Sequence, residues 1–362
     1  MTSWMFSAVV WLSVAASAVA AEVDAEAVAV VRKVQIKSAG TVVDELLPGA
    51  IVEVMAREGE LLQIRTNKTG WIERSAVVPV SEAADYFTRA IAGNPRQAEL
   101  YRARAMVYRS QRQFDRAIAD FDEAVRLDPR SALAFAGRGV AWKQRGNVDR
   151  AIADLDEALK INPALVSGFV TRGQLWLSKH ENDRAIHDFS AAQRLNPKNP
   201  EPYFLRALAR GNDDRDQAVA DCSEAIRLGL EDVADYGAKG YELRAILLYN
   251  QRKLADAILD LDIVLKADPD NTEMLFHRGN AWRRIGNHNK AIADFTQLVM
   301  LDPMYPDVYY WRAHAWEAKG DLIHALEDAE AAVQIDPSDP PALRYRDKLK
   351  SRLRAATPGG GG

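Results

Sequence analysis

The sequence predicts a mainly α-helical solenoid made of seven copies of a two-helix repeat, preceded by a small all-β domain. A motif of thirteen residues, AIADFDEAVRLDP at 117–129, returns as AIADLDEALKINP at 151–163 and as AIADFTQLVMLDP at 291–303. The prolines that close the motif lie 34 residues apart, at 129, 163 and 197 and again at 269, 303 and 337. A period of this length is typical of a helix-turn-helix solenoid, whereas before residue 81 the hydrophobic pattern alternates as in strands.

Composition and charge bound the class of protein. The chain has 362 residues, which is too long for one simple core. Its composition, 48% hydrophobic and 27% charged, is typical of folded protein. The formal net charge of −4 gives no overall basic field, so no nucleic-acid partner is expected. The only cysteine, Cys222, excludes a disulfide within the chain. It falls at a core position of the repeat, where we expect it to be buried.

Residues 1–20 are predicted to be a secretory signal peptide. The apolar run at 4–20 ends in Ala18, Val19 and Ala20, a pattern of small residues that precedes cleavage, so a mature chain starting near Ala21 is expected. Because no basic residue precedes the run, an uncleaved membrane anchor and a buried helix of a cytosolic protein stay open as alternatives. The segment predicts an exported protein of the periplasm or cell envelope, anchored in the membrane if residues 4–20 are retained.

Residues 27–80 are predicted to form a small barrel of about five strands. Short β-rich runs at 52–56, 61–66, 69–73 and 76–80 are separated by turn residues. Residues 46–80 resemble bacterial SH3-like domains, in which a Gly-Trp pair, here Gly70 and Trp71, opens the penultimate strand and a Val-Pro pair, here Val78 and Pro79, closes the domain. The resemblance implies that the domain binds peptides or cell-wall material. The alternative is that it only packs on the first repeat.

Each repeat reads as two helices that cannot bury their apolar faces alone and therefore need a neighbour. In 132–165, Phe135, Gly139 and Trp142 share one face of a first helix, and Gly146 and Asn147 end it. The second helix repeats the same spacing with Ala151, Leu155 and Ala158. The pattern resembles the tetratricopeptide repeat, which implies a right-handed superhelix whose inner groove binds a protein or peptide. The copies are 98–131, 132–165, 166–199, 200–232, 238–271, 272–305 and 306–339.

The two ends of the array and its middle depart from the repeat. Residues 81–95 match a second helix and are predicted to cap the front, while 340–355 are predicted to form a capping helix at the back, followed by a flexible tail at 356–362. The fourth copy is one residue short, and five extra residues, 233–237, precede the fifth. We therefore expect two sub-stacks, 98–232 and 238–339, that meet at an altered angle near 229–240.

Two charged positions recur in every copy. Position 7 of the first helix is always arginine, and each second helix has an aspartate just before its core residue. Two interpretations are possible: the arginines form a row that binds a ligand, or each arginine forms an internal bidentate pair with the aspartate of its own copy and bridges the two helices. The equal numbers of the two residues, at a fixed register, favour the internal pairs. The arginines are Arg104, Arg138, Arg172, Arg206, Arg244, Arg278 and Arg312, and the aspartates are Asp120, Asp154, Asp188, Asp221, Asp260, Asp294 and Asp328.

The resemblance also implies which residues face the partner, since positions 2, 5, 9, 12 and 13 of each first helix line the inner face in that family. Copies two to four then give a mostly apolar stripe of Leu133, Val140, Val170, Leu177, Phe204 and Leu208. Copies five to seven give a polar and aromatic patch of Tyr249, Phe276, Asn280, Arg283, Arg284, Tyr310 and His314. Of the residues by which some members grip a carboxylate, only Asn280 matches. The alternative is that the apolar residues merely pack between neighbouring first helices.

Charges on this inner face balance, which suits a peptide or helix with an apolar stretch and one acidic group held by Arg283 or Arg284 better than it suits a polyanion. No catalytic motif, metal-binding motif or cofactor-binding loop occurs, so no enzyme, metal or cofactor is expected. The sequence therefore predicts an exported, non-catalytic scaffold that binds a protein or peptide. The alternatives are a cell-envelope protein whose SH3-like domain holds wall material and a non-catalytic subunit of an enzyme complex.

Overall fold

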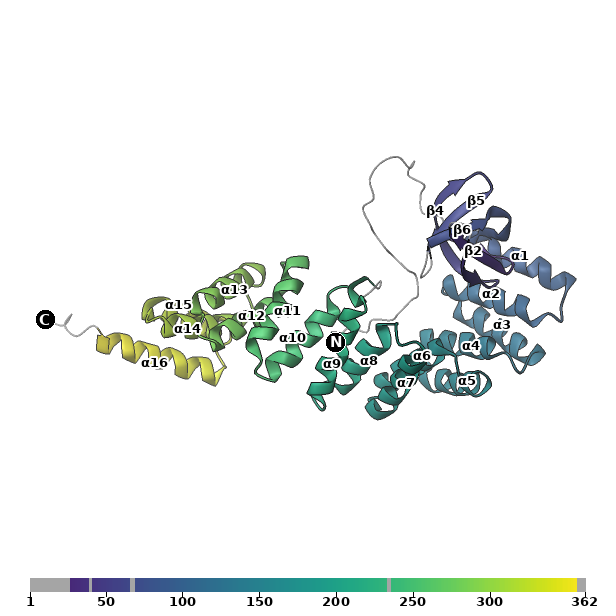
Figure 1. Cartoon of the computed structure of the whole chain (residues 1–362). Helices are drawn as coiled ribbons and strands as arrows, with labels where there is room; N and C mark the ends of the chain where they lie inside the picture. Colours follow the sequence, from purple (N-terminus) through teal and green to yellow (C-terminus); the bar gives the residue numbers. More distant parts are fainter. Residues whose placement is uncertain (1–26, 39–40, 66–68, 233–235, 357–362) are drawn as a thin grey trace. The chain divides into compact units, whose positions relative to one another are not determined.

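A computed structural model describes residues 27–38, 41–65, 69–232 and 236–356 (Figure 1). The predicted signal peptide at 1–20 and, apart from residue 356, the predicted tail lie outside these residues. The chain divides into two compact units, Met1–Pro197 and Lys198–Gly362. Within the described residues, no helix combines the length and apolar character that crossing a bilayer requires.

The first unit opens with an antiparallel sheet whose strands have the order β3-β2-β6-β5-β4-β1-β7. Alternate residues of these strands, including Val54, Ile64 and Ile72, point into a common apolar core. The strands are β1 (Ala27–Val30), β2 (Val34–Ser38), β3 (Thr41–Leu46), β4 (Ile51–Glu58), β5 (Leu61–Arg65), β6 (Thr69–Glu73) and β7 (Val77–Pro79).

The prediction of a closed barrel is wrong, because the described sheet is open with β3 and β7 at its edges. Strand β7 has only three residues and ends at Pro79, where the chain turns directly into helix α1 (Val80–Gly93) instead of returning to β3. Gly70 and Trp71 lie in β6, the penultimate strand. A Cβ on Gly70 would come within 2.4 Å of the Ile36 side chain, so this position needs glycine.

The sheet shares a core with the first two helices, α1 and α2 (Ala98–Ser110). Ala29 of β1 packs with Phe87 of α1 and Ala103 of α2, and each of the three side chains is fully buried. The turn between β3 and β4 lies directly on α2: a Cβ on Gly49, which has φ of +87°, would be 2.7 Å from the Ala103 backbone. The domain therefore packs on the first repeat, and binding of peptides or cell-wall material by it stays a prediction.

The rest of the first unit consists of helix pairs. Within the second copy, small residues let the two helices approach, since a Cβ on Gly139 would lie 3.1 Å from the Ala151 carbonyl oxygen. Asn147 begins the second helix by accepting a hydrogen bond from the Arg150 amide. The helices are α3 (Phe114–Leu127), α4 (Ala132–Gln144), α5 (Val148–Ile161), α6 (Val166–Ser178) and α7 (Asn182–Leu195).

The second unit continues the pattern of helix pairs and ends with a single helix, α16. Its helices are α8 (Glu201–Arg210), α9 (Arg215–Arg227), α10 (Lys239–Asn250), α11 (Leu254–Ala267), α12 (Thr272–Arg284), α13 (His288–Leu301), α14 (Pro306–Ala318), α15 (Leu322–Ile335) and α16 (Pro340–Ala356). The fold is thus a mainly helical repeat solenoid preceded by an open β sheet. The capping helix predicted at 340–355 corresponds to α16.

The region near 229–240, where we predicted a break between sub-stacks, lies inside the second unit. A short 3-10 helix (Leu230–Asp232) connects α9 toward α10, and Leu230, which stands where other copies have proline, is fully buried. A Cβ on Gly240 would lie 2.9 Å from the Leu230 side chain, so Leu230 packs tightly on α10. The two compact units divide one repeat earlier, after Pro197, and an altered angle near 229–240 stays a prediction.

Candidate functional site

The recurring arginines and aspartates form bidentate ion pairs inside each repeat. In the second copy, Arg138 Nε donates to Asp154 Oδ2 at 2.8 Å and its second terminal nitrogen donates to Oδ1 at 2.6 Å. The same two bonds, at 2.7–3.0 Å, join the other pairs: Arg104–Asp120, Arg172–Asp188, Arg206–Asp221, Arg244–Asp260, Arg278–Asp294 and Arg312–Asp328. All seven pairs therefore bridge a first helix to its second helix.

Most of these pairs also have a link to the preceding repeat, which the sequence analysis missed. The remaining terminal nitrogen of Arg138 donates to Asp122 Oδ1 at 2.7 Å, and Arg172 reaches Asp156 in the same way at 2.6 Å. The sequence does contain a pattern that indicates this link: a side chain with an oxygen acceptor stands two residues after the recurring aspartate of the preceding copy. The corresponding acceptors elsewhere are Ser223 for Arg244, Asp262 for Arg278 and Thr296 for Arg312, while Arg104 donates to Thr88 of helix α1, which precedes the first repeat.

The residues of the predicted apolar stripe differ in their burial. Val170 and Phe204 are buried, whereas Leu133 and Leu208 are exposed by 43% and 48%. The ring of Phe204 packs edge-on against Tyr236 at 5.1 Å between ring centres, inside the second unit. Val140 and Leu177 are half-buried. Val170 and Phe204 are therefore part of the packed interior, and a partner surface along this stripe stays a prediction.

The predicted polar and aromatic patch does come together, on the neighbouring first helices α10, α12 and α14 of the second unit. The Arg283 guanidinium lies 4.3 Å from the ring centre of Trp311, and its Nε donates to Asn280 Oδ1 at 3.3 Å. The Arg284 guanidinium lies 5.1 Å from the Tyr249 ring. We call Tyr249, Asn280, Arg283, Arg284 and Trp311 the Arg283 cluster.

The electrostatics of Arg283 follow from its partial burial. It is half-buried, and no carboxylate among the described residues forms an ion pair with it. Burial lowers the pKa of Arg283, and the neighbouring charge of Arg284 acts in the same direction. Arginine stays charged under these conditions, so the site holds a partly desolvated cation that an incoming carboxylate would stabilise.

Other predicted members of the patch support the fold around this cluster. Phe276 packs against Tyr305 at 5.5 Å and against Phe295 at 6.3 Å between ring centres. Asn280 is only 5% exposed and donates its amide to the Phe276 carbonyl oxygen at 3.2 Å. Phe276 is therefore a poor choice for a mutation meant to leave stability unchanged.

Helix α16 covers the end of the patch. His314 stacks on Tyr345 of α16 with 4.0 Å between ring centres, and Tyr310 packs edge-on against both rings. Burial, together with the charge of Arg283, lowers the pKa of His314 to about 4, so it is neutral near pH 7. Glu317 accepts hydrogen bonds from Tyr345 at 2.7 Å and from neighbouring cations of α16: Lys348, at 3.0 Å, and Arg352.

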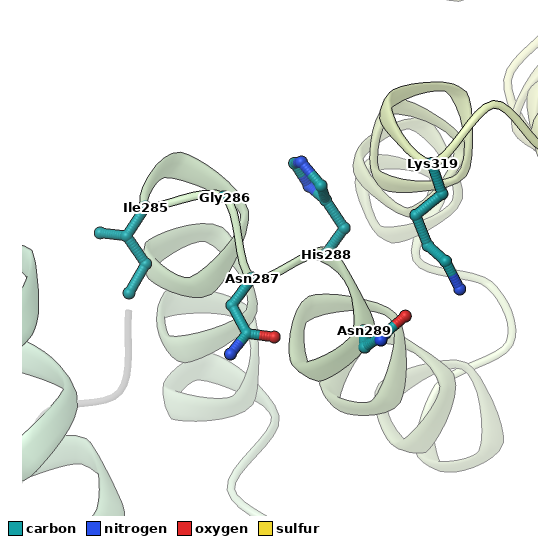
Figure 2. Close-up of a pocket in the computed structure, with 6 residues that line it drawn as sticks. All are labelled: Ile285, Gly286, Asn287, His288, Asn289 and Lys319. Carbon is teal, nitrogen blue, oxygen red and sulfur yellow. The ribbon is translucent and has the colours of Figure 1, made fainter.

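A shallow cavity of about 380 Å³ lies at the turn between α12 and α13, beside Lys319 (Figure 2). Gly286 takes φ of +86° in this turn, and Asn287 begins α13 by accepting a hydrogen bond from the Lys290 amide. Figure 2 shows the side chains of Ile285, Asn287, His288 and Asn289 spread around the turn rather than converging on one point. The cavity therefore follows from the turn geometry.

The repeats match a known family. The family model of the tetratricopeptide repeat matches residues 102–165, 243–299 and 283–340. Among proteins with curated descriptions, none matches the chain. Solved structures share the fold: the C-terminal part of a repeat-containing protein from Cytophaga hutchinsonii is 16% identical, with a TM-score of 0.55, over 67% of this chain and 97% of that one.

Two further structures align less closely. A tetratricopeptide repeat protein from Parabacteroides merdae is 15% identical, with a TM-score of 0.47, over 70% of this chain and 98% of that one. In the Cut9–Hcn1 complex of the APC/C, the aligned chain is 14% identical, with a TM-score of 0.44, and the match covers 75% of this chain and 52% of that one. The family model thus covers two stretches of the helical region, 102–165 and 243–340, and the helix pairs of this region form a solenoid similar to those of tetratricopeptide repeats.

Proposed function

We propose that this protein is a non-catalytic scaffold that binds a protein or peptide partner through the first-helix face of repeats five to seven, with the Arg283 cluster at its centre. Proteins built of tetratricopeptide repeats generally serve as protein-binding scaffolds. The observation that carries the proposal is the half-buried Arg283 guanidinium, which lies against Trp311 and has no carboxylate partner among the described residues. A carboxylate of the partner would supply the missing charge, and the adjacent aromatic rings would contact its apolar groups.

Export to the periplasm or cell envelope is part of this proposal and rests on the apolar run at 4–20 and its Ala-Val-Ala ending. The β domain is assigned a structural role in it, because Gly49 and Pro48 lie on α2 and Ala29 enters the core of the first repeat. Amino-terminal sequencing of protein from its native source tests export. A mature terminus near Ala21 is expected, and Met1 or Thr2 on a soluble protein would contradict it.

Partner binding is tested with Arg283→Gln and Arg284→Gln combined in one variant. The original protein, this variant and an Arg252→Gln control are each cross-linked to their neighbours in an extract of the native cells, and the captured proteins are identified by mass spectrometry. Arg252 lies in a turn outside the cluster. Specific partners should be lost from the double variant and kept in the control, while the thermal melts of both match that of the original protein. Equal capture by both variants would place the binding site elsewhere.

A further inference from the structure

The first-helix face of repeats five to seven has an acidic end as well as a basic one. Glu242, Glu273 and Asp307 lie in the first turns of α10, α12 and α14, and none of them forms an ion pair with another described residue. Glu242 is half-buried, and burial raises its pKa; the nearby charge of Lys239 opposes this shift, and the charge of Glu273 adds to it. A carboxylate in this position gains from an incoming cation, as Arg283 gains from an incoming anion.

The two ends are held at a fixed separation by a single helix. Glu273 lies in the first turn of α12 and Arg283 in its last turn, ten residues later, which corresponds to about 15 Å along the helix axis. Phe276 lies between them, half-buried, with its ring against Tyr305. Because α10 and α14 flank α12 in the same unit, the acidic side chains and the arginines form two separate charged ends with aromatic residues between them.

Compensation of helix dipoles explains part of this arrangement, since carboxylates stabilise the first turn of a helix and cations the last. It does not explain why these carboxylates and arginines form no ion pairs with other described residues. In the first unit, two cations just after first helices are paired: Lys179 Nζ lies 2.7 Å from Asp149 Oδ1, and Arg145 pairs with Asp115. Arg109, in the last turn of α2, is half-buried and, like Arg283, forms no ion pair with a described carboxylate. The arginines that end α12 instead lie on aromatic rings.

We infer that this face recognises a polypeptide segment that carries a cationic side chain and a carboxylate about 15 Å apart, with the cation held by Glu242 and Glu273 and the carboxylate by Arg283 and Arg284. This inference rests on the proposed function and adds the polarity of the partner to it. In an extended segment, about 15 Å corresponds to four or five residues between the two charges, at roughly 3.3 Å per residue. In a helical segment it corresponds to about ten residues.

The first experiment selects ligands from a phage library of random twelve-residue peptides on the full chain. Enriched sequences should pair Lys or Arg with Asp or Glu, four or five positions apart, and carry an apolar residue between them. A synthetic peptide of the enriched sequence is then compared with its Lys→Gln and Glu→Gln versions by fluorescence anisotropy.

The second step measures whether the effect of each peptide substitution on affinity disappears in the protein variant that lacks the matching charges. The Lys→Gln peptide should bind the original protein about three- to fivefold more weakly, and this difference should vanish in a Glu242→Gln, Glu273→Gln variant. The Glu→Gln peptide should behave in the same way toward the Arg283→Gln, Arg284→Gln variant. Glu327→Gln on α15, an exposed carboxylate away from this face, is the control and should change neither difference.

The outcomes separate the inference from the proposed function. Enriched peptides that are acidic but never basic, with binding that depends on Arg283 and not on Glu242, would overturn the two-ended face and leave the scaffold proposal standing. Enriched peptides whose binding ignores both ends would overturn both. A coupling at each end, measured independently, would establish the polarity of the bound segment.

Discussion

Arg138 and Asp154 are joined by two parallel hydrogen bonds, of 2.8 and 2.6 Å, that tie the first helix of the second repeat to its second helix. Only 18% of the Arg138 side chain and 10% of the Asp154 side chain are exposed, so each charge depends on the other after desolvation. The same relationship recurs in all seven repeats and fixes the register of the two helices in each of them.

Removal of one partner should destabilise the protein because the other stays buried and unpaired. Arg138→Ala and Asp154→Ala are each expected to lower the free energy of unfolding by about 1–3 kcal/mol. Urea denaturation followed by circular dichroism measures this, with the exposed Arg130→Ala as control. If Arg138→Ala and Asp154→Ala both unfold at the same urea concentration as the control, the pair does not stabilise the repeat.

The link from one repeat to the next should be weaker. Asp122 accepts a single hydrogen bond from Arg138, and its own side chain is 57% exposed, so Asp122→Ala is expected to cost about 0.5–1 kcal/mol. This cost should disappear when Arg138 has already been replaced, because the two residues act through one contact. A double-mutant cycle on urea midpoints measures the coupling, and strict additivity would show that Asp122 acts independently.

The close approach of the β domain to α2 gives a third prediction. Gly49→Ala should destabilise the first unit, because a Cβ there would be 2.7 Å from the Ala103 backbone, which has no flexible end to move aside. Gly59→Ala is a matched control: Gly59 also has a positive φ, of +57°, but a Cβ added there would meet no other atom within 4 Å. Thermal melts of both variants isolate the steric contribution, and equal losses would assign the effect to backbone strain alone.

The sequence predicted the repeats well because their apolar residues recur at fixed spacing and each copy repeats the evidence of the others. Cys222 is buried with no exposed surface, as its position in the repeat predicted, and burial raises the pKa of its thiol to about 12. The sheet was harder to predict, because strand closure depends on pairing between distant strands and not on local pattern. The position of α16 over His314 was also missed, since the packing of a terminal helix has no repeated copy to reveal it.

Neutral His314 should make stability depend on pH. Its pKa in the folded chain is about 4, below the ordinary value of 6.5, so the unfolded chain binds the proton more tightly and stability falls as pH drops from about 6.5 to 4. The loss should reach about 1–3 kcal/mol. His314→Phe keeps the stacking on Tyr345 without the titration, so urea midpoints measured from pH 7 to pH 4.5 should fall less in this variant. Identical curves would show that His314 does not titrate in this window.

The contact between Glu317 and α16 gives the last prediction. The Glu317 side chain is 13% exposed and accepts from Tyr345, Lys348 and Arg352, which all belong to α16. Glu317→Gln keeps the size of the side chain but removes the charge that holds two cations, so α16 should detach more often from α14. Amide hydrogen exchange across residues 340–356 should then become faster by about tenfold or more, which corresponds to a local loss of about 1.4 kcal/mol.

The control for this experiment is Glu330→Gln, because Glu330 also pairs with a lysine of α16, Lys350, at 2.8 Å. Its side chain is 49% exposed, so water already screens the pair and its loss should leave exchange in α16 almost unchanged. Faster exchange confined to α16 in the Glu317 variant alone would show that one largely buried carboxylate secures the terminal helix. Equal exchange in the two variants would mean that apolar packing of Tyr345 and Leu349 holds α16 without it.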